Sequence, residues 1–245
     1  MANIIKCRGF VLNTMPFKES SLIASVLTNN LGKVKLLAKG IRRPRSKMCG
    51  AMERFNFDEL IYYKRDFKEI YTLSDAVVID SYSEIRGDPY KVSAAVVLCE
   101  FYDRTLPAEA PDRASFSELT RFLKGLKKTG RTGVRALVVG HLCRALSGSG
   151  VMPHLNDCVR CHRPAGGGNG RLDFSVMAGG VVCDKHHDDT VIGLSQQTVK
   201  TLVNLYRGAP LELSDNAVRE IESFMVDYMH LHLNNLNLRS LKHFK

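Results

Sequence analysis

The chain has 245 residues, 44% hydrophobic and 24% charged, which is the balance of a globular protein with one large domain or a few small ones. Its formal net charge is +10, and residues 1–80 hold 14 Lys or Arg against 8 Asp or Glu, so a basic module precedes a more balanced body. No apolar run approaches the roughly 20 residues of a membrane helix, no signal peptide is recognisable, and the seven cysteines do not form a disulfide framework, which favours a reduced, cytoplasmic protein.

The first third of the chain has the pattern of β structure. Short runs rich in β-branched and aromatic residues are separated by turns. These runs are Ile4–Leu12, Leu22–Thr28, Lys33–Lys39, Phe55–Tyr63 and Glu69–Leu73. Their close spacing leaves no room for crossover helices, so we expect residues 1–82 to form a small, closed, five-stranded barrel.

The third of these runs opens the most basic stretch of the chain, residues 33–47 (KVKLLAKGIRRPRSK). Its first half alternates apolar and basic side chains as a strand does, and an arginine-rich loop follows Gly40. It contains no acidic residue and seven cations, Lys33, Lys35, Lys39, Arg42, Arg43, Arg45 and Lys47. Such a row of cations predicts a nucleic-acid-binding surface, and a merely solvated charged face is the alternative.

Helical patterns begin at Asp88, which is followed by proline as an N-cap and a first helical residue often are. A capping box that starts at Ser115 predicts the next helix. The expected helices cover residues 88–106, 116–128, 132–147, 195–206 and 214–234. The whole chain is therefore predicted to be a multidomain α+β protein, with one helical domain made of residues 83–150 and 193–245.

Residues 151–192 interrupt the helices with a glycine-rich segment. It has few large apolar side chains and cannot bury a core of its own, so it needs a cross-link such as a bound metal ion. Cys158-Val-Arg-Cys161 is followed, after 21 residues, by Cys183-Asp-Lys-His186. Ligand pairs at i and i+3 can reach one tetrahedral zinc ion. We expect one structural Zn²⁺ held by Cys158, Cys161, Cys183 and His186. His187 competes as the fourth ligand, and free thiols are the alternative to a metal.

The chain carries no credible catalytic motif. It lacks the His-x-Glu of a zinc deaminase, a His-Glu-x-x-His, a Walker loop and a Gly-x-Ser-x-Gly elbow. A metal-dependent DNA-processing enzyme would need a carboxylate cluster, for which the candidates are Asp58, Glu59, Asp66 and Glu69. We interpret the protein as a non-enzymatic DNA-binding protein, and an RNA-binding or transcription-associated protein is the other alternative.

Several blocks fall in order across nearly the whole chain. They are AKGIRRPRSKMCG (38–50), ERFNFDELIYY (53–63), GVMPHLNDCVRC (150–161), the Phe174-Ser, Gly179-Gly180 and Cys183 positions, and LRSLK (238–242). Together they closely resemble the RecO family of bacterial recombination mediators. One departure is His186, since the zinc-bearing members usually have Cys there. Some members have lost the zinc, which supports a structural role for it.

The resemblance implies an N-terminal OB-fold barrel, a helical domain and an inserted zinc module. It also implies a DNA repair protein at the nucleoid that binds single- and double-stranded DNA and anneals complementary strands. With RecR, and indirectly RecF, such a protein lets RecA displace single-strand-binding protein during recombinational repair.

OB barrels bind single strands through a basic groove and aromatic side chains. The stacking candidates are Phe55, Phe57, Tyr62 and Tyr63, of which we expect at least half to lie inside the barrel. A second basic stretch, on the predicted helices, contains Arg121, Lys124, Arg131 and Arg135 beside Leu123, Leu126, Val134 and Leu137. We predict that these cations flank an apolar groove for the acidic, Phe-ended tail of single-strand-binding protein, and a solvated helix face is the alternative.

Overall fold

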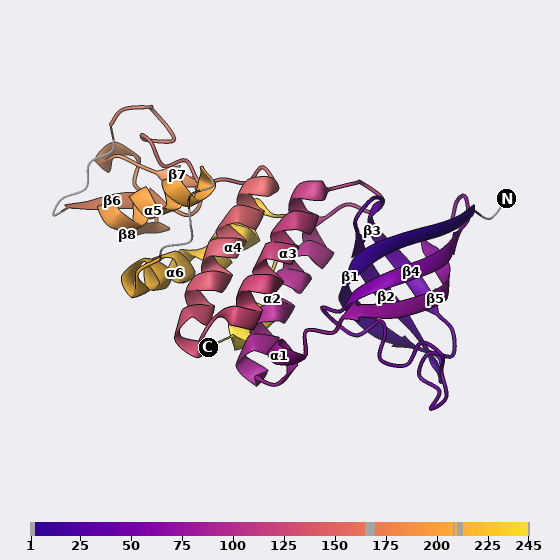
Figure 1. Cartoon of the computed structure of the whole chain (residues 1–245). Coiled ribbons are helices and arrows are strands. Elements are labelled where there is room, and N and C mark those ends of the chain that lie inside the picture. Colours follow the sequence, from indigo (N-terminus) through magenta and orange to yellow (C-terminus); the bar gives the residue numbers. More distant parts are fainter. Residues whose placement is uncertain (1–2, 165–169, 208, 210–212, 245) are drawn as a thin grey trace. The chain divides into compact units, whose positions relative to one another are not determined.

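The computed structural model describes residues 3–164, 170–207, 209 and 213–244 (Figure 1). The chain forms two compact units. Unit 1 comprises Met1–Arg131 with Ser240–Lys245, and unit 2 comprises Thr132–Arg239. Within the described residues, no helix has the length and apolar character needed to cross a membrane.

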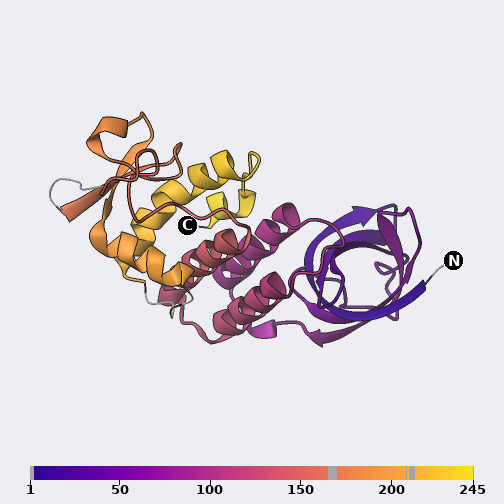
Figure 2. The same cartoon turned by 90° about the horizontal axis from the view of Figure 1, so that it is seen from above.

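Unit 1 begins with five strands whose sheet closes on itself, in the order β1-β2-β3-β5-β4. The strands are β1 (Asn3–Phe17), β2 (Ser21–Thr28), β3 (Gly32–Ala38), β4 (Phe57–Lys64) and β5 (Ile70–Asp80). All five predicted strands are present. Closure depends on the long β1, whose first half pairs with β4 and whose second half, from Gly9 on, pairs with β2. The ladder with β2 has a register shift between Val11 and Asn13. Figure 2 shows the resulting ring of strands end-on.

The connection between β3 and β4 is folded onto the barrel. Its residues Ile41, Ala51 and Met52 are buried in the same apolar core as the inward side chains of the strands. Met52 has a φ of 60°, which is unfavourable for a residue with a side chain. The buried carboxylate of Asp58 accepts a hydrogen bond from the Met52 N–H at 2.8 Å and so helps to hold that conformation.

The helices of unit 1 are α1 (Ser83–Arg86), α2 (Pro89–Thr105) and α3 (Arg113–Lys128). The Asp88 side chain accepts a hydrogen bond from the Tyr90 N–H, so the predicted N-cap of α2 is confirmed. The predicted capping box of α3 is wrong. Asp112 is the N-cap, because its carboxylate accepts both the N–H and the hydroxyl hydrogen of Ser115.

The barrel and the helices of unit 1 share an aromatic cluster. Phe10 of β1 stacks on Phe57 of β4 at 4.7 Å and lies 5.1 Å from Phe116 of α3, between ring centroids. Helix α7 (Arg239–His243) leads the chain back into unit 1, where Phe244 stacks on Tyr90. The barrel is therefore one wall of a larger core and not a separately packed body.

Unit 2 contains α4 (Val134–Gly148), which follows the 3₁₀ turn η1 (Arg131–Gly133), and then α5 (Gln196–Tyr206) and α6 (Asp215–His232). Between α4 and α5 lies a sheet of order β7-β6-β8 that sequence reasoning did not predict. Its strands are β6 (Arg171–Ser175), β7 (Gly180–Val181) and β8 (Val191–Ser195), and the 3₁₀ turn η3 (Asp184–His186) joins β7 to β8. Phe174 of β6 is buried and packs on Phe224 and Tyr228 of α6, so the glycine-rich segment has a share in the core of unit 2.

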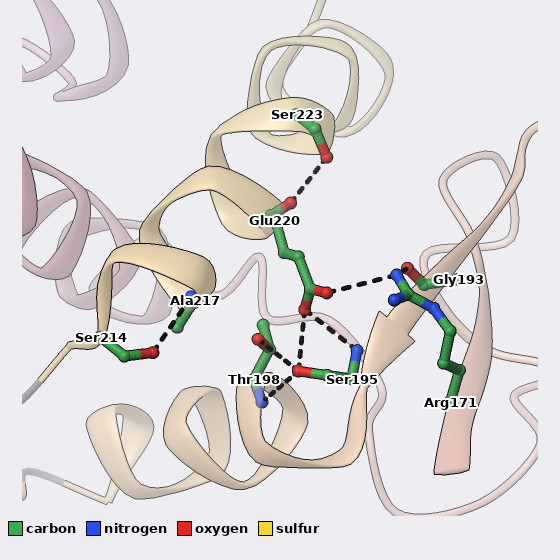
Figure 3. Close-up of polar contacts among 8 residues, drawn as sticks. All are labelled: Arg171, Gly193, Ser195, Thr198, Ser214, Ala217, Glu220 and Ser223. Atoms are coloured by element: carbon green, nitrogen blue, oxygen red, sulfur yellow. Dashed lines mark hydrogen bonds and ion pairs between the residues drawn. The ribbon is translucent and has the colours of Figure 1, made fainter. Parts of the chain in front are cut away.

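A half-buried carboxylate, that of Glu220, ties this sheet to the helices of unit 2 (Figure 3). Glu220 of α6 accepts hydrogen bonds from the N–H (3.0 Å) and the hydroxyl (2.9 Å) of Ser195, the N-cap of α5. It also pairs with Arg171 of β6 at 3.2 Å. One side chain thus connects the start of α5, helix α6 and the central strand β6 of the sheet.

Candidate nucleic-acid surface and metal-binding cluster

The basic stretch lies on β3 and on the loop that follows it. Val34, Leu36 and Ala38 point into the barrel, as the alternation predicted. Six of the seven cations are exposed and, among the described residues, no carboxylate forms an ion pair with any of them. They are Lys35, Lys39, Arg42, Arg43, Arg45 and Lys47, called the basic surface below.

The backbone of the arginine loop is ordered by its own hydrogen bonds. The Arg42 N–H donates to the Ser20 carbonyl at 2.9 Å, which attaches the loop to the β1–β2 turn. The Arg43 N–H donates to Gly40, and the Ser46 N–H donates to Arg43. The cations of this loop therefore project from a folded chain, which reduces the entropy lost when they bind a polyanion.

Lys33 differs from the other six cations. It is half-buried, and its ammonium donates to the carbonyl of Asp103 in the last turn of α2, a favourable place for a cation. Burial lowers the pKa of Lys33. Its carbonyl accepts the N–H of Glu109 at 2.9 Å, in the loop between α2 and α3. Lys33 therefore serves packing in unit 1 and is a weak candidate for binding a phosphate.

Two of the four aromatic candidates lie in the interior, as expected: Tyr62 is 0% and Phe55 is 2% exposed. Phe57 is half-buried in the aromatic cluster, and Tyr63 is the exposed member of the four, at 39%. Sequence reasoning missed Phe67, whose side chain is fully exposed at the turn between β4 and β5. The sequence could have indicated this exposure, because Phe67 lies inside a charged hairpin turn, where an aromatic side chain has no core to enter.

The four carboxylates that might have held magnesium do not converge. Asp58 is buried beneath the β3–β4 connection. Glu59 lies on the outer face of the barrel, where its carboxylate pairs with Lys6 at 3.0 Å and Arg8 at 3.7 Å. None of the clusters of metal-binding side chains found among the described residues includes these carboxylates.

The predicted cysteine and histidine ligands come together in unit 2. Nδ1 of His186 lies 3.5 Å from Sγ of Cys158 and 3.4 Å from Sγ of Cys183, and the sulfurs of Cys161 and Cys183 are 3.8 Å apart. A tetrahedral zinc ion with Zn–S bonds of about 2.3 Å and a Zn–N bond of about 2.0 Å requires edges of about 3.8 Å between sulfurs and about 3.5 Å between sulfur and nitrogen. The four atoms thus have the spacing of a metal site, and the sulfurs are too far apart for a disulfide.

Two tight turns place these ligands. The His162 N–H donates to the Cys158 carbonyl at 2.8 Å in the first turn, and the His186 N–H donates to the Cys183 carbonyl at 2.8 Å in the second. Burial alone would raise the pKa of Cys158, but the backbone N–H groups of Cys183, Arg160 and Cys161 outweigh it and lower that pKa to about 5. The thiolate form of Cys158, which binds metals, is therefore favoured. The Arg163 N–H lowers the pKa of Cys161, but burial and the neighbouring sulfurs outweigh it and raise that pKa.

The neighbouring histidines have other partners. Nε2 of His187 lies 3.0 Å from a carboxylate oxygen of Asp173, so His186 and not His187 completes the cluster. Asp157 lies 2.6 Å from His154 and 3.3 Å from His162, which orients both imidazoles outside the four-ligand set. The carboxylate partners hold these rings at the surface of the module.

Most of the apolar side chains that were predicted to form a groove beside the second basic stretch are buried. Leu123, Leu126 and Val134 are 0% exposed and therefore offer no surface to a partner. In unit 1, Arg121 pairs with Glu118.

In unit 2, Arg135 pairs with Glu222. It also lines a hollow of about 340 Å³ at the start of α4 and α6. The other residues that line this hollow are Thr132, Ala136, Asp215, Val218 and Arg219.

Comparison with known proteins extends over both units. The sequence matches the family described as Recombination protein O N terminal over residues 1–82, and Recombination protein O C terminal over residues 86–242. It is 30% identical over 239 residues to the DNA repair protein RecO of Exiguobacterium sp. (strain ATCC BAA-1283 / AT1b), covering 93% of this chain and 92% of that protein. The DNA repair protein RecO of Alkaliphilus metalliredigens is 24% identical over 247 residues, covering 98% of each chain.

Proposed function

Because the chain belongs to the RecO family of DNA repair proteins, we propose that it is a recombination mediator that binds DNA and is not an enzyme. In this role it binds single- and double-stranded DNA and anneals complementary strands. With RecR, and indirectly RecF, it helps RecA to load onto DNA coated with single-strand-binding protein. These partners place it at the nucleoid in the cytoplasm.

One observation carries this proposal: six exposed cations gather on one strand and one ordered loop of a closed five-stranded barrel, without carboxylate partners in the described part of the chain. The strand order is that of an OB fold, a barrel that binds nucleic acids. Cations that contact phosphates and not base edges bind any sequence. They also screen the repulsion between two strands, which is what annealing requires.

The test is the salt dependence of DNA binding. Each phosphate contact to a single strand contributes about 0.7 to the slope of log K against log salt, so Arg42→Ala/Arg43→Ala/Arg45→Ala should lower the slope by about 2. The matched control is Lys33→Ala, which should leave the slope unchanged because its ammonium contacts Asp103. An unchanged slope and unchanged strand annealing in the triple variant would refute the basic surface. Preference for an RNA over a DNA oligomer of the same sequence would favour the RNA-binding alternative.

Stacking on exposed aromatic side chains should add to this affinity. We propose Tyr63 and Phe67, which are exposed at the end of β4 and in the turn after it, as the residues that contact bases. Loss of either ring should weaken single-strand binding and leave duplex binding unchanged, because duplex bases are already stacked. Equal loss for both forms of DNA would contradict this role.

We propose that the cluster of Cys158, Cys161, Cys183 and His186 holds one structural Zn²⁺. The support is the tetrahedral spacing of two turns, and three thiolates with one imidazole are a donor set that zinc prefers. Native mass spectrometry should find one zinc per chain, and His186→Ala should lose it while His186→Cys keeps it. Retention by His186→Ala would remove this histidine from the ligand set.

Recognition of single-strand-binding protein through Arg121, Lys124, Arg131 and Arg135 stays a prediction. Charge reversal at each position should weaken binding of an acidic, Phe-ended peptide, measured by fluorescence anisotropy. Unchanged affinity in all four variants would reject these residues. The hollow beside Arg135 is the part of this set that offers a recess to a phenyl ring.

A further inference from the structure

A hollow opens beside the arginine loop, within unit 1. Its volume is about 370 Å³, which falls in the range of small-molecule sites, about 300–1,000 Å³. The ends of β1 and β2 and both halves of the β3–β4 connection line it. The lining residues used below are Thr14, Leu22, Ile41, Arg42, Cys49, Met52, Glu53 and Arg54.

The floor of the hollow is apolar and preformed. Ile41 and Met52 belong to the barrel core, and Leu22 packs against that core. The Met52 backbone is fixed by Asp58, and the Phe55 N–H donates to the Val11 carbonyl at 2.7 Å. A ligand that enters this hollow therefore meets a rigid apolar surface that already exists, which keeps the ordering cost of binding low.

The rim of the hollow is cationic. Arg42 is exposed and belongs to the basic surface, and Arg54 is held by a 2.7 Å hydrogen bond to the side-chain oxygen of Asn13. The one carboxylate of the rim, Glu53, is paired with Arg86 at 3.3 Å, so it is partly neutralised. A polyanion is therefore drawn to this rim.

We propose that this hollow receives one unstacked base of single-stranded DNA, while the flanking phosphates lie on Arg42 and Arg54. The inference rests on the proposed function, because Arg42 belongs both to the rim of the hollow and to the basic surface. An apolar floor beneath a phosphate-binding rim suits the two halves of a nucleotide, a flat π face and an anion. Duplex DNA keeps its bases stacked and so binds only the rim, which makes the hollow a device that distinguishes single strands from duplexes.

Cys49 supplies a natural probe, since its side chain lines the hollow and is exposed, whereas Cys7, Cys99 and Cys143 are buried. The probes are a single-stranded thymidine oligomer and an oligomer of the same length built from abasic units, which keeps the phosphates and lacks the bases. Each is added to the full chain at saturation, and maleimide labelling of Cys49 is followed peptide by peptide by mass spectrometry. We expect the thymidine oligomer to protect Cys49 and the abasic oligomer to leave it reactive.

A filled hollow gives the second measurement. Thr14→Trp places a large side chain in the hollow without removing a cation, and Val77→Trp, at an exposed position of β5, is the matched control. The natural chain has no Trp, so the emission of the new indole reports whether it is buried. Thr14→Trp should bind the thymidine oligomer about tenfold more weakly, since it loses the contact of one base, and it should bind the abasic oligomer equally well.

The outcomes separate the two proposals. Equal protection of Cys49 by both oligomers, or equal affinity of Thr14→Trp and the natural chain for the thymidine oligomer, would overturn the base-binding hollow and leave the basic surface intact. Failure of both oligomers to bind would overturn the proposed function itself.

Discussion

Burial of Asp58 makes the stability of the barrel depend on pH. Its side chain is 0% exposed, and one carboxylate oxygen accepts the Met52 N–H while the other has no hydrogen-bond partner in the described structure. Burial raises the pKa of Asp58 from 3.8 to about 6, against the smaller opposite effects of the Met52 N–H and the Asn56 side chain. The folded barrel therefore binds a proton more tightly than the unfolded chain does.

The sign and size of the effect follow from this shift. A raised pKa in the folded state contributes stability that is fully present below about pH 4 and is lost as the pH rises through about 6. The full shift of about two units corresponds to about 3 kcal/mol, and the part lost between pH 5 and pH 8 is about 1.4 kcal/mol. Asp58→Asn removes the titration and keeps an oxygen for the Met52 N–H.

Urea unfolding at pH 5 and pH 8 measures this difference. The probe is labelling of Cys7, which lies in the barrel core at 5% exposure, by a disulfide reagent that reacts at both pH values. The stability difference between Asp58→Asn and the natural chain should change by about 1.4 kcal/mol between the two pH values, in favour of the variant at pH 8. Asp66→Asn, at an exposed position, is the control. A pH-independent difference would show that Asp58 is ionised throughout and refute the reasoning.

Three further changes test other contacts. Gly32→Ala should lower the free energy of unfolding by about 2 kcal/mol or more, because φ at Gly32 is +71° and the new Cβ would overlap the Ala110 carbonyl oxygen. Gly130→Ala, with open space around it, is the control, and equal urea midpoints for the two variants would contradict this prediction. Cys158→Ser should abolish metal binding and make residues 157–187 sensitive to a protease while the barrel resists. An unchanged cleavage pattern would argue that a metal ion does not stabilise this segment. Glu220→Ala should lower the unfolding free energy of unit 2 by about 1–3 kcal/mol, because the N–H and the hydroxyl of Ser195, at the start of α5, lose the carboxylate that accepts their hydrogen bonds. Unchanged hydrogen exchange in α5 would contradict this prediction.

Local chemistry predicted much of the fold. The N-caps Asp88, Ser195 and Ser214 each accept a backbone N–H, and their helices begin where the sequence indicated. The start of α3 was misplaced because Asp112 and Ser115 are both good caps, and only the folded chain shows that Asp112 accepts both hydrogens of Ser115. The short strand β7 left no periodicity to detect, because it consists of only two residues, Gly180 and Val181.

The exposure of the basic surface was predictable for the set of cations but not residue by residue. Alternation along β3 showed which side chains leave the barrel, and this was right for Lys35. It was silent about Lys33, because what covers that residue is the end of α2 and the loop after it, about 70 positions away along the chain. Period-two patterning identifies a face of a strand, whereas accessibility along that face depends on tertiary contacts that no local window contains.

In the cluster of cysteines and histidine, too, local spacing predicted part of the arrangement and tertiary contacts decide the rest. Spacing alone indicated which four ligands come together, since two residues between paired ligands fit a tight turn in each half. Spacing favoured His186 but left His187 as a competitor, because either imidazole ring has the chemistry of a zinc ligand. The choice follows from Asp173 on β6, whose carboxylate holds His187 at 3.0 Å and so turns it away from the sulfurs. Strand β6, which sequence reasoning missed, therefore holds the competing histidine away from the cluster. If His186 is placed by its own turn, Asp173→Ala should leave the metal content of the protein unchanged, and a changed metal content would show that Asp173 contributes to the choice of ligand.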